Sequence, residues 1–300
     1  MKKFLMLFAL LLAKLNLSFC SNLESLNEKE IAFLKTPVSE DILISEIPVM
    51  DNERYVHLNY ARIQPDFIKD VLTPSSGDKK EILDICSGQG LCFKSLLIEQ
   101  NKSSAAQGFH YTAVETQESN IRELKTNYTQ NSKTKGNWLG CAQKGVVDYL
   151  THNKEAKKDK FDTVFAGFAL HVLTAQDFVQ TIDELHNVMK EGSKLYITLN
   201  SYSGDAYTSD YIEQFKKGDI LPFWANSSSY FSSDPFSMKT VLETFGFEVK
   251  KSGLYRQIQD RKSLTKYLGI IAQKVERSNL NGAESKRKAY YKRAQNLMKH

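Results

Sequence analysis

The sequence predicts an α/β fold: a mostly parallel sheet of seven strands, with an antiparallel last strand and helices on both faces. From residue 81 onward, apolar runs alternate with helical patterns, which is typical of parallel strands joined by crossover helices. The first run, "ILDICSGQG" at residues 82–90, leads directly into two glycines, as expected where a strand turns into a helix. The last two runs are separated by too little chain for a helical crossover, so we expect antiparallel neighbours.

The apolar runs and helical patterns give the order of the predicted elements. The expected strands are residues 81–85, 110–114, 136–140, 161–166, 194–199, 246–254 and 266–273. The expected helices between them are residues 91–100, 117–130, 143–152 and 175–190. These elements form one predicted domain over residues 80–275, which contains an aromatic-rich insert at residues 200–238.

The first 79 residues differ from this pattern and divide into two parts. Lys2 and Lys3 precede the apolar stretch "FLMLFALLLA", so residues 1–20 are predicted to be a signal peptide for secretion or export to a periplasm. The stretch is too short to span a bilayer, for which about 20 apolar residues are needed. Residues 21–79 are predicted to be a cap of helical and extended chain, because a helical pattern at residues 22–34 is followed by four prolines.

The formal net charge of +5 is unevenly distributed along the chain. Residues 274–300 carry eight Lys or Arg and two Glu, which leaves −1 for the remainder, so no overall basic surface for nucleic acid is expected. The basic tail at residues 276–300 is predicted to be a solvated helix or frayed end, with contact to an anionic membrane as the alternative. Without the signal peptide, Cys86, Cys92 and Cys141 remain, and their odd number indicates neither a disulfide framework nor a metal site.

The glycine turn after the first strand is the first candidate for a ligand site, because ligands of open α/β sheets bind beyond the carboxyl ends of the strands. Gly88 and Gly90 allow the backbone to approach a ligand closely. A dinucleotide site requires a small residue where Phe93 stands. Glu115 ends the next strand, where an acid can accept hydrogen bonds from both ribose hydroxyls, and Asp84 can bind a cationic amino group. The pattern describes a ligand with a ribose and an amino acid but no phosphate.

These motifs together carry a resemblance to a known family. "ILDICSGQG", Glu115 in "AVETQ" and "KFDTVFAGFALHVL" at residues 160–173 resemble the class I S-adenosylmethionine-dependent methyltransferases. "IDELHNVMKEGSKLYITL" at residues 182–199 is similar to the helix, turn and fifth strand of that family, and "LETFGFEVKKSG" resembles its sixth strand. The resemblance covers roughly residues 80–275 and implies a Rossmann-like class I methyltransferase fold with S-adenosylmethionine as the cofactor.

The resemblance also implies roles for individual residues. The residues expected to surround the methionine part of the cofactor, to hold its ribose and to complete the site are Asp84, Ser87, Gly88, Gly90, Glu115, Gly167 and Phe168. The family often has an acid after the third strand that contacts adenine; "LGCAQKG" has none here, which leaves Asp148 as the candidate substitute. An N-terminal segment often closes the site, and Tyr60 and Arg62 in "YARIQP" are its candidates.

The acceptor side is predicted from two later segments. His171 in "ALHVL" is the candidate catalytic base, because a histidine exchanges protons near neutral pH; the alternative is that it lines the pocket or binds backbone. "GFAL" stands where enzymes acting on exocyclic base amines or glutamine amides have Asn or Asp before Pro-Pro, which disfavours such acceptors. Tyr202 and Trp224 represent the insert aromatics, which either build an apolar substrate pocket or pack the insert onto the sheet.

Three functions are open at the level of sequence. The first is methyl transfer to a small, partly apolar or aromatic acceptor. The second is methyl transfer to a protein side chain by an enzyme secreted into a host cell. The third is a non-catalytic secreted module that retains the fold. An exported enzyme would lack a cofactor made in the cytosol; delivery to a host cell that supplies it, or an uncleaved signal, would remove the conflict.

Overall fold

The computed structural model describes residues 40–43, 63–73, 79–102, 108–131, 136–153, 158–201, 223–225, 230–232, 235–259, 262–277 and 283–297. All of them belong to one compact unit, Val38–Ala206 together with Ile220–His300. The predicted signal peptide and most of the predicted cap lie outside the described residues, as do Tyr60, Arg62 and Tyr202. Of Trp224, only the backbone is described.

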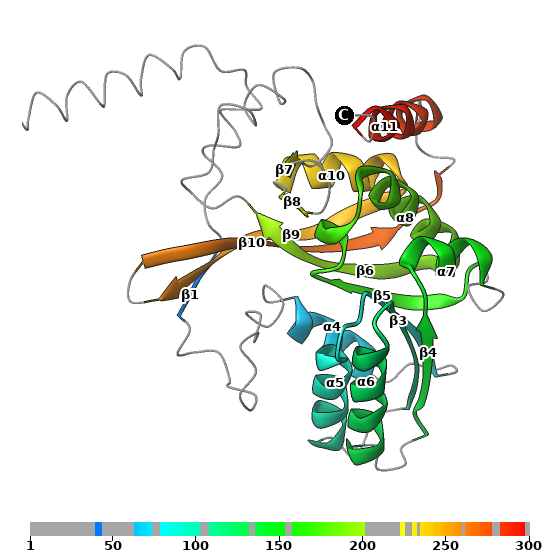
Figure 1. The fold of residues 1–300 in the computed structure, drawn as a ribbon, viewed down its shortest axis with the longest axis vertical. Coiled ribbons are helices and arrows are strands. Elements are labelled where there is room, and N and C mark those ends of the chain that lie inside the picture. The colour runs from blue at the N-terminus through cyan, green and yellow to red at the C-terminus, as the bar shows by residue number, and fades with distance from the viewer. Residues whose placement is uncertain are drawn as a thin grey trace, which may run out of the picture. The chain divides into compact units, whose positions relative to one another are not determined.

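Eight strands of the described chain form the central sheet (Figure 1). Their order is β1 (Glu40–Leu43), β9 (Phe247–Gln259), β10 (Lys262–Lys274), β6 (Met189–Ser201), β5 (Phe161–Gly167), β2 (Lys80–Ile85), β3 (Phe109–Glu115) and β4 (Trp138–Gln143). β10 runs antiparallel to both neighbours, and every other pairing is parallel. The seven predicted strands and the antiparallel last strand are confirmed. β1 adds a short eighth strand, and β7 (Phe223–Ala225) with β8 (Tyr230–Ser232) forms a separate hairpin in the insert.

Helices cover both faces of the sheet in two layers, which Figure 1 shows below and above the strands. One layer consists of α4 (Gln64–Leu72), α5 (Leu91–Lys102) and α6 (Glu118–Asn131). The other consists of α7 (Val146–His152), α8 (Ala175–Val188), α10 (Pro235–Thr244), α11 (Ala283–Leu297) and the 3-10 helix η2 (Leu170–Val172). Each layer buries its own apolar cluster against the sheet. Helices on both faces of a mostly parallel sheet are the arrangement that the alternating sequence pattern predicts.

Strand β2 shows why this sheet needs two apolar layers. Its side chains alternate between the faces: Ile82 packs in the cluster with α4 and α5, whereas Leu83 and Ile85 pack in the cluster with α8. Asp84 follows the same alternation and lies on the Ile82 side, where it is buried. A carboxyl therefore stands at a position that the pattern of the strand would give to an apolar residue.

Helix α8 shows how local sequence fixes an element that supports the site. The Thr174 hydroxyl caps the helix by accepting from the Asp177 N–H at 3.1 Å, which satisfies one of the unpaired donors of the first turn. Phe178, Ile182 and Leu185 follow at helical spacing and are fully buried. The helix begins soon after η2, so its cap also determines where η2 ends.

Two predicted elements need correction. β4 spans Trp138–Gln143 rather than residues 136–140, because the strand continues through Cys141 and Ala142 to stay in register with β3 as far as Glu115. The basic tail is not a frayed or wholly solvated end: in α11, Tyr290 is 2% exposed and packs in the apolar cluster that includes Phe245. Among the described helices, none is long and apolar enough to cross a membrane.

Candidate active site

The glycine turn between β2 and α5 has three residues in the left-handed region of backbone conformation. Cys86, Gly88 and Gly90 have φ values of +52°, +54° and +78°. Left-handed conformation favours glycine, so Cys86 adopts it against its own preference. A Cβ on Gly90 would lie 2.7 Å from Leu124 Cγ on α6, whereas no atom of the described residues lies within 4 Å of where a Cβ on Gly88 would stand. Gly90 therefore permits close packing, and Gly88 faces open space.

Glu115, the last residue of β3, ties this turn to the neighbouring strand. Its Oε2 accepts a hydrogen bond from the Gly88 N–H at 2.8 Å. Its Oε1 accepts from the N–H groups of Thr116 at 2.8 Å and Gln117 at 2.9 Å. Glu115 is only 8% exposed. The predicted ribose acid and the glycine turn are thus brought together, and backbone donors hold the carboxylate in one orientation.

Asp84 lies below the same turn and is 2% exposed. Its Oδ2 accepts a hydrogen bond from the Tyr111 hydroxyl. Burial raises the pKa of Asp84 to about 7; the Tyr111 hydrogen bond lowers it, and the nearby Glu115 charge raises it. The carboxyl is therefore balanced between its neutral and ionised forms near neutral pH.

These features define what kind of ligand the turn can accept. Within the described residues, the hydrogen-bond partners of Asp84 and Glu115 are hydroxyl and backbone N–H groups, not cations. The buried Ser87 Oγ has no hydrogen-bond partner in the described part of the chain. Two buried acids close together favour a ligand that brings positive charge, and the Ser87 hydroxyl is a further polar contact for it. The residues present fit an ammonium-bearing nucleoside.

Asp148, the predicted adenine contact, lies on the surface of a helix, and whether it contacts adenine stays a prediction. Asp148 lies in the first turn of α7, with its side chain 53% exposed, and pairs with Lys144 at 3.5 Å and His152 at 3.2 Å on the helix surface. The residue that the register sets beside Glu115 is Gln143, at the carboxyl end of β4. Sequence reasoning missed Gln143 because the predicted strand ended three residues too early. The backbone pairing, not the Asp148 position, therefore marks the neighbour of the ribose acid.

Phe168 follows the last residue of β5, Gly167, and is the centre of a second group of side chains. It has a φ of +55°, and its N–H donates to the carbonyl oxygen of Thr198 at 2.9 Å and to the Thr198 hydroxyl at 3.2 Å. Its ring meets the ring of His171 edge-on at 5.8 Å and that of Tyr267, on β10, at 5.4 Å. Strained backbone in a bulky residue is concentrated at functional sites, and here the strain presents an aromatic cluster at the carboxyl end of β5.

The predicted base, His171, belongs to this aromatic cluster. It lies in η2 and is 7% exposed. Strand β8 of the insert hairpin packs against η2 and β6. The insert therefore reaches the side of the sheet at which the sequence predicted acceptor binding. Tyr267 was not predicted, because its position next to Phe168 depends on the antiparallel pairing of β10 with β6.

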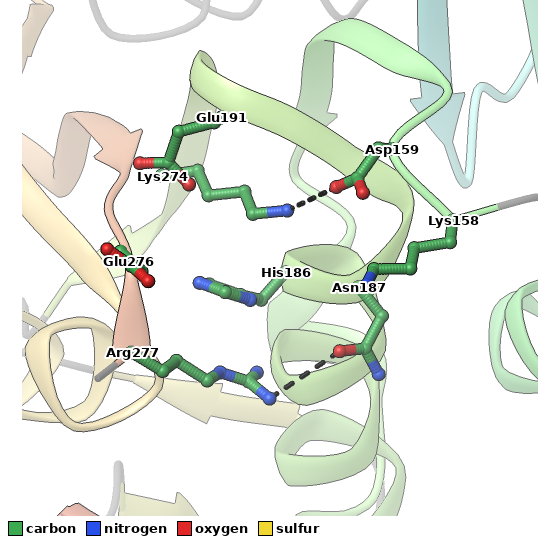
Figure 2. Close-up of a pocket in the computed structure, with 8 residues that line it drawn as sticks. All are labelled: Lys158, Asp159, His186, Asn187, Glu191, Lys274, Glu276 and Arg277. Carbon is green, nitrogen blue, oxygen red and sulfur yellow. Dashed lines mark hydrogen bonds and ion pairs between the residues drawn. The ribbon is translucent and has the colours of Figure 1, made fainter.

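A pocket of about 630 Å³ lies at the opposite edge of the sheet, where β5 and β6 begin and β10 ends. Its lining residues are Lys158, Asp159, His186, Asn187, Glu191, Lys274, Glu276 and Arg277 (Figure 2). Figure 2 shows the Lys274 ammonium pointing at Asp159, 2.8 Å away. Lys274 also donates to the Met189 carbonyl oxygen at 2.6 Å, so its charge is satisfied by the protein. None of the predicted site residues lines this pocket.

Comparison with known proteins gives one family match and several similar solved structures. Residues 83–197 match the model of a family described as a methyltransferase domain. No curated protein matches the chain. The solved carbon methyltransferase of CurJ is 14% identical, covers 73% of this chain and 54% of its own, and has a TM-score of 0.50, which shows a shared fold.

Two further solved structures are similar to this chain. The first is a SAM-dependent methyltransferase from Archaeoglobus fulgidus: 16% identity, 72% of this chain and 93% of its own, TM-score 0.49. The second is the 1,6-didemethyltoxoflavin-N1-methyltransferase of Burkholderia thailandensis: 14% identity, 76% of this chain and 94% of its own, TM-score 0.48.

The residues of the carboxyl edge lie within the matched segment, as do five of the eight residues that line the pocket at the opposite edge. Asp84, the glycine turn, Glu115 and Phe168 all lie within residues 83–197. The two buried acids suit the ammonium group and the ribose of S-adenosylmethionine, and the family match was obtained independently of that geometry. Residues 83–197 therefore match the methyltransferase-domain family model, and the geometry of the carboxyl edge fits the S-adenosylmethionine site that the sequence resemblance implies.

Proposed function

We propose that this protein transfers a methyl group from S-adenosylmethionine to a small acceptor that is partly apolar or aromatic. The observation that carries the proposal is the aromatic cluster of Phe168, His171 and Tyr267, whose rings meet edge-on at the carboxyl end of the sheet. An apolar wall beside a cofactor site favours flat or apolar acceptors over highly charged ones. The β8 strand against η2 supports an acceptor pocket that the insert helps to cover.

In this proposal, different residues of the described chain contact different parts of the cofactor and the acceptor. S-adenosylmethionine, when bound, supplies a methyl group that its sulfonium makes electrophilic. Glu115 accepts hydrogen bonds from ribose hydroxyls, and Asp84 in its ionised form pairs with the ammonium group. Gly88 leaves the space that a side chain would occupy. The aromatic cluster excludes water and orients the acceptor, which are the main tasks of the protein in this reaction.

His171 has a defined role in the proposal, which is to accept a proton from a hydroxyl or protonated amine acceptor. Its place in the aromatic cluster supports this role. His171→Ala is expected to lower kcat by about 10²-fold or more and, at saturating S-adenosylmethionine, to remove the acidic limb of the pH profile of kcat. His152→Gln, at an exposed position on α7, serves as the matched control. A pH–rate profile of His171→Ala with the shape of the unmodified profile would eliminate the base role.

Cofactor binding by the full chain tests the proposal first. Isothermal titration with S-adenosylmethionine is expected to give one site, and Glu115→Ala to abolish or severely weaken it, because the variant loses the ribose contact and the anchor of the Gly88 N–H. Glu118→Ala is the matched control, since Glu118 is an exposed acid three residues away with only a surface ion pair to Arg122. Absence of binding by the unmodified protein would refute the proposal.

Acceptor screening distinguishes a small molecule from a protein. With cofactor labelled in the methyl group, label in a low-molecular-weight fraction is the expected result, and label confined to protein would contradict the proposed acceptor class. A matched reaction with Glu115→Ala corrects for label that is transferred without this site.

The proposal includes export, with residues 1–20 as a cleaved signal and a host cell as the source of the cofactor. The lysine-flanked apolar stretch at that end supports it. Mass spectrometry of the chain recovered outside the producing cell is expected to find a mature form that begins near Ser21. Recovery of the intact chain only in the cytosol would contradict export and leave the enzymatic proposal standing.

A further inference from the structure

We propose that Tyr111 is a positioning residue for the cofactor: its hydroxyl keeps Asp84 available as the carboxylate that pairs with the ammonium group, and so sets the pH range in which the cofactor binds. The inference rests on S-adenosylmethionine binding as proposed above. It assigns a role to a residue that neither touches the predicted ligand nor belongs to a recognised motif.

Tyr111 is a fixed donor. It lies on β3, where it pairs with Ile82 of β2, two residues from the pair of Asp84 with Ala113, so both side chains share one face. The residue is fully buried, and its ring packs against those of Phe93 at 4.7 Å and Phe109 at 6.4 Å. The hydroxyl donates to Asp84 Oδ2. A ring held on two sides keeps its hydroxyl oxygen beside Asp84, so the donor is available to the carboxyl without any movement of the core.

The other groups around Asp84 disfavour its ionised form or carry no charge. Glu115, on the same strand as Tyr111, raises the pKa of Asp84 through its negative charge. The thiols of Cys86 in the turn and Cys92 on α5 are neutral, because burial raises the pKa of Cys86 to about 12 and that of Cys92 well above its usual value. Within the described residues, the Tyr111 hydroxyl is thus the group that stabilises the carboxylate before a ligand arrives.

This balance gives binding a definite pH dependence. An ammonium group pairs with an ionised Asp84 and gains nothing from a protonated one. Since the pKa of Asp84 is about 7 in the absence of ligand, affinity should fall as pH decreases below about 7, approaching tenfold per pH unit. Loss of the Tyr111 hydroxyl raises the pKa of Asp84 and moves the whole binding curve to higher pH.

Isothermal titration with S-adenosylhomocysteine, which retains the ammonium group and the ribose, measures this directly. The full chain and Tyr111→Phe are compared between pH 5.5 and 7.5, a range in which the ligand amine stays protonated. A hydrogen bond to a charged group corresponds to a shift of roughly one pH unit, so Tyr111→Phe should bind about fivefold more weakly at pH 7. Tyr290→Phe is the matched control, because Tyr290 is another buried tyrosine but lies on α11.

A second ligand isolates the ammonium group. 5′-Methylthioadenosine has the adenosine and the thioether but no amino acid, so its affinity should be equal in the unmodified protein and Tyr111→Phe, and should lack the fall below pH 7. Equal loss of affinity for both ligands in Tyr111→Phe would mean that the hydroxyl supports the fold of the site rather than Asp84, and would overturn the inference.

The remaining outcomes separate this inference from the proposed function. If S-adenosylhomocysteine binds and Tyr111→Phe has an unshifted pH curve, the positioning role is wrong and the methyltransferase proposal stands. If the unmodified protein binds neither ligand, both fail. Should Tyr111→Phe not fold, Asp84→Asn replaces it: its weak binding should be independent of pH over the same range, and a persisting fall below pH 7 would overturn the inference.

Discussion

Gly88 and Gly90 have similar backbone angles but different surroundings, so we expect alanine to have different effects at the two positions. Alanine in the left-handed region costs about 1 kcal/mol at either position. At Gly90 the new methyl would also press on the fully buried Leu124, so we expect Gly90→Ala to lower the free energy of unfolding by about 2–4 kcal/mol. Urea denaturation measures both. We expect Gly88→Ala to be mildly destabilising but to lose cofactor affinity; equal stability losses in the two variants would contradict this division.

His186 gives a pH-dependent contribution to stability. Its Nε2 donates to the Val275 carbonyl oxygen at 3.0 Å, and burial lowers its pKa to about 4, with the Arg277 and Lys274 charges acting in the same direction. In the unfolded chain this histidine is protonated as pH falls through about 6.5, whereas in the folded chain it is protonated only near pH 4. The stability is therefore complete above about pH 6.5 and is lost as pH falls toward 4, by up to roughly 2 kcal/mol after screening.

The measurement compares urea unfolding of the unmodified protein and His186→Gln from pH 7 to pH 4.5. Because the raised pKa of Asp84 acts in the opposite direction, the difference between the two proteins is the relevant quantity rather than either curve. His152→Gln, at an exposed position on α7, is the control. A constant difference across this range would show that His186 does not titrate as its burial implies.

The sequence predicted the candidate residues whose place at a strand end can be read from the order of elements along the chain. It did not predict those whose neighbours are set by the pairing register of the strands. Glu115 and Gly88 were expected at neighbouring strand ends, and the structure joins them by a hydrogen bond. Tyr111, Gln143 and Tyr267 were not expected, since their neighbours belong to other strands. Which residue of one strand lies beside which residue of another depends on the sheet register, which local patterns do not determine.

At the scale of elements, α11 is the part that the sequence least explained. Its basic composition suggested a solvated end, because charged residues dominate the segment and conceal two positions that turn inward. Asp183 on α8 accepts from Arg277 at 2.6 Å and from the Tyr291 hydroxyl at 2.9 Å, so acid on the main domain meets the basic tail. Tyr290 and Ala294 then reach the apolar cluster. A composition average could not show this face.

Removing the Tyr290 side chain tests the docking of α11. We expect Tyr290→Ala to lower the free energy of unfolding by about 3 kcal/mol, the usual cost of deleting a buried aromatic side chain. Lys292→Ala, on the exposed side of the same helix, should change it by less than about 0.5 kcal/mol. Urea denaturation at pH 7 distinguishes the two. Similar small effects would mean that α11 does not contribute to the core in solution.

At the scale of the whole molecule, the two edges of the sheet carry different kinds of charge. The carboxyl edge keeps two buried acids, Asp84 and Glu115, without a cationic partner among the described residues. At the opposite edge, the buried ammonium group of Lys274 in the pocket of Figure 2 is paired. It binds Asp159 and the Met189 carbonyl oxygen. An unpaired buried charge costs stability and is retained where a ligand uses it, whereas a paired one can be structural. We therefore place the proposed ligand site at the carboxyl edge rather than at this pocket.

Lys274→Met tests this assignment. The substitution keeps an unbranched side chain of similar length and leaves Asp159 half exposed to water, so the main loss is the bond to Met189 and the ion pair. We expect a decrease of about 1–3 kcal/mol in the free energy of unfolding, with the Kd for S-adenosylhomocysteine unchanged within about twofold at a temperature where the variant stays folded. Glu115→Ala should lose affinity at a temperature where it stays folded, together with the stability that its three backbone hydrogen bonds contribute. A large loss of affinity in the folded Lys274→Met variant would instead place ligand binding at the pocket.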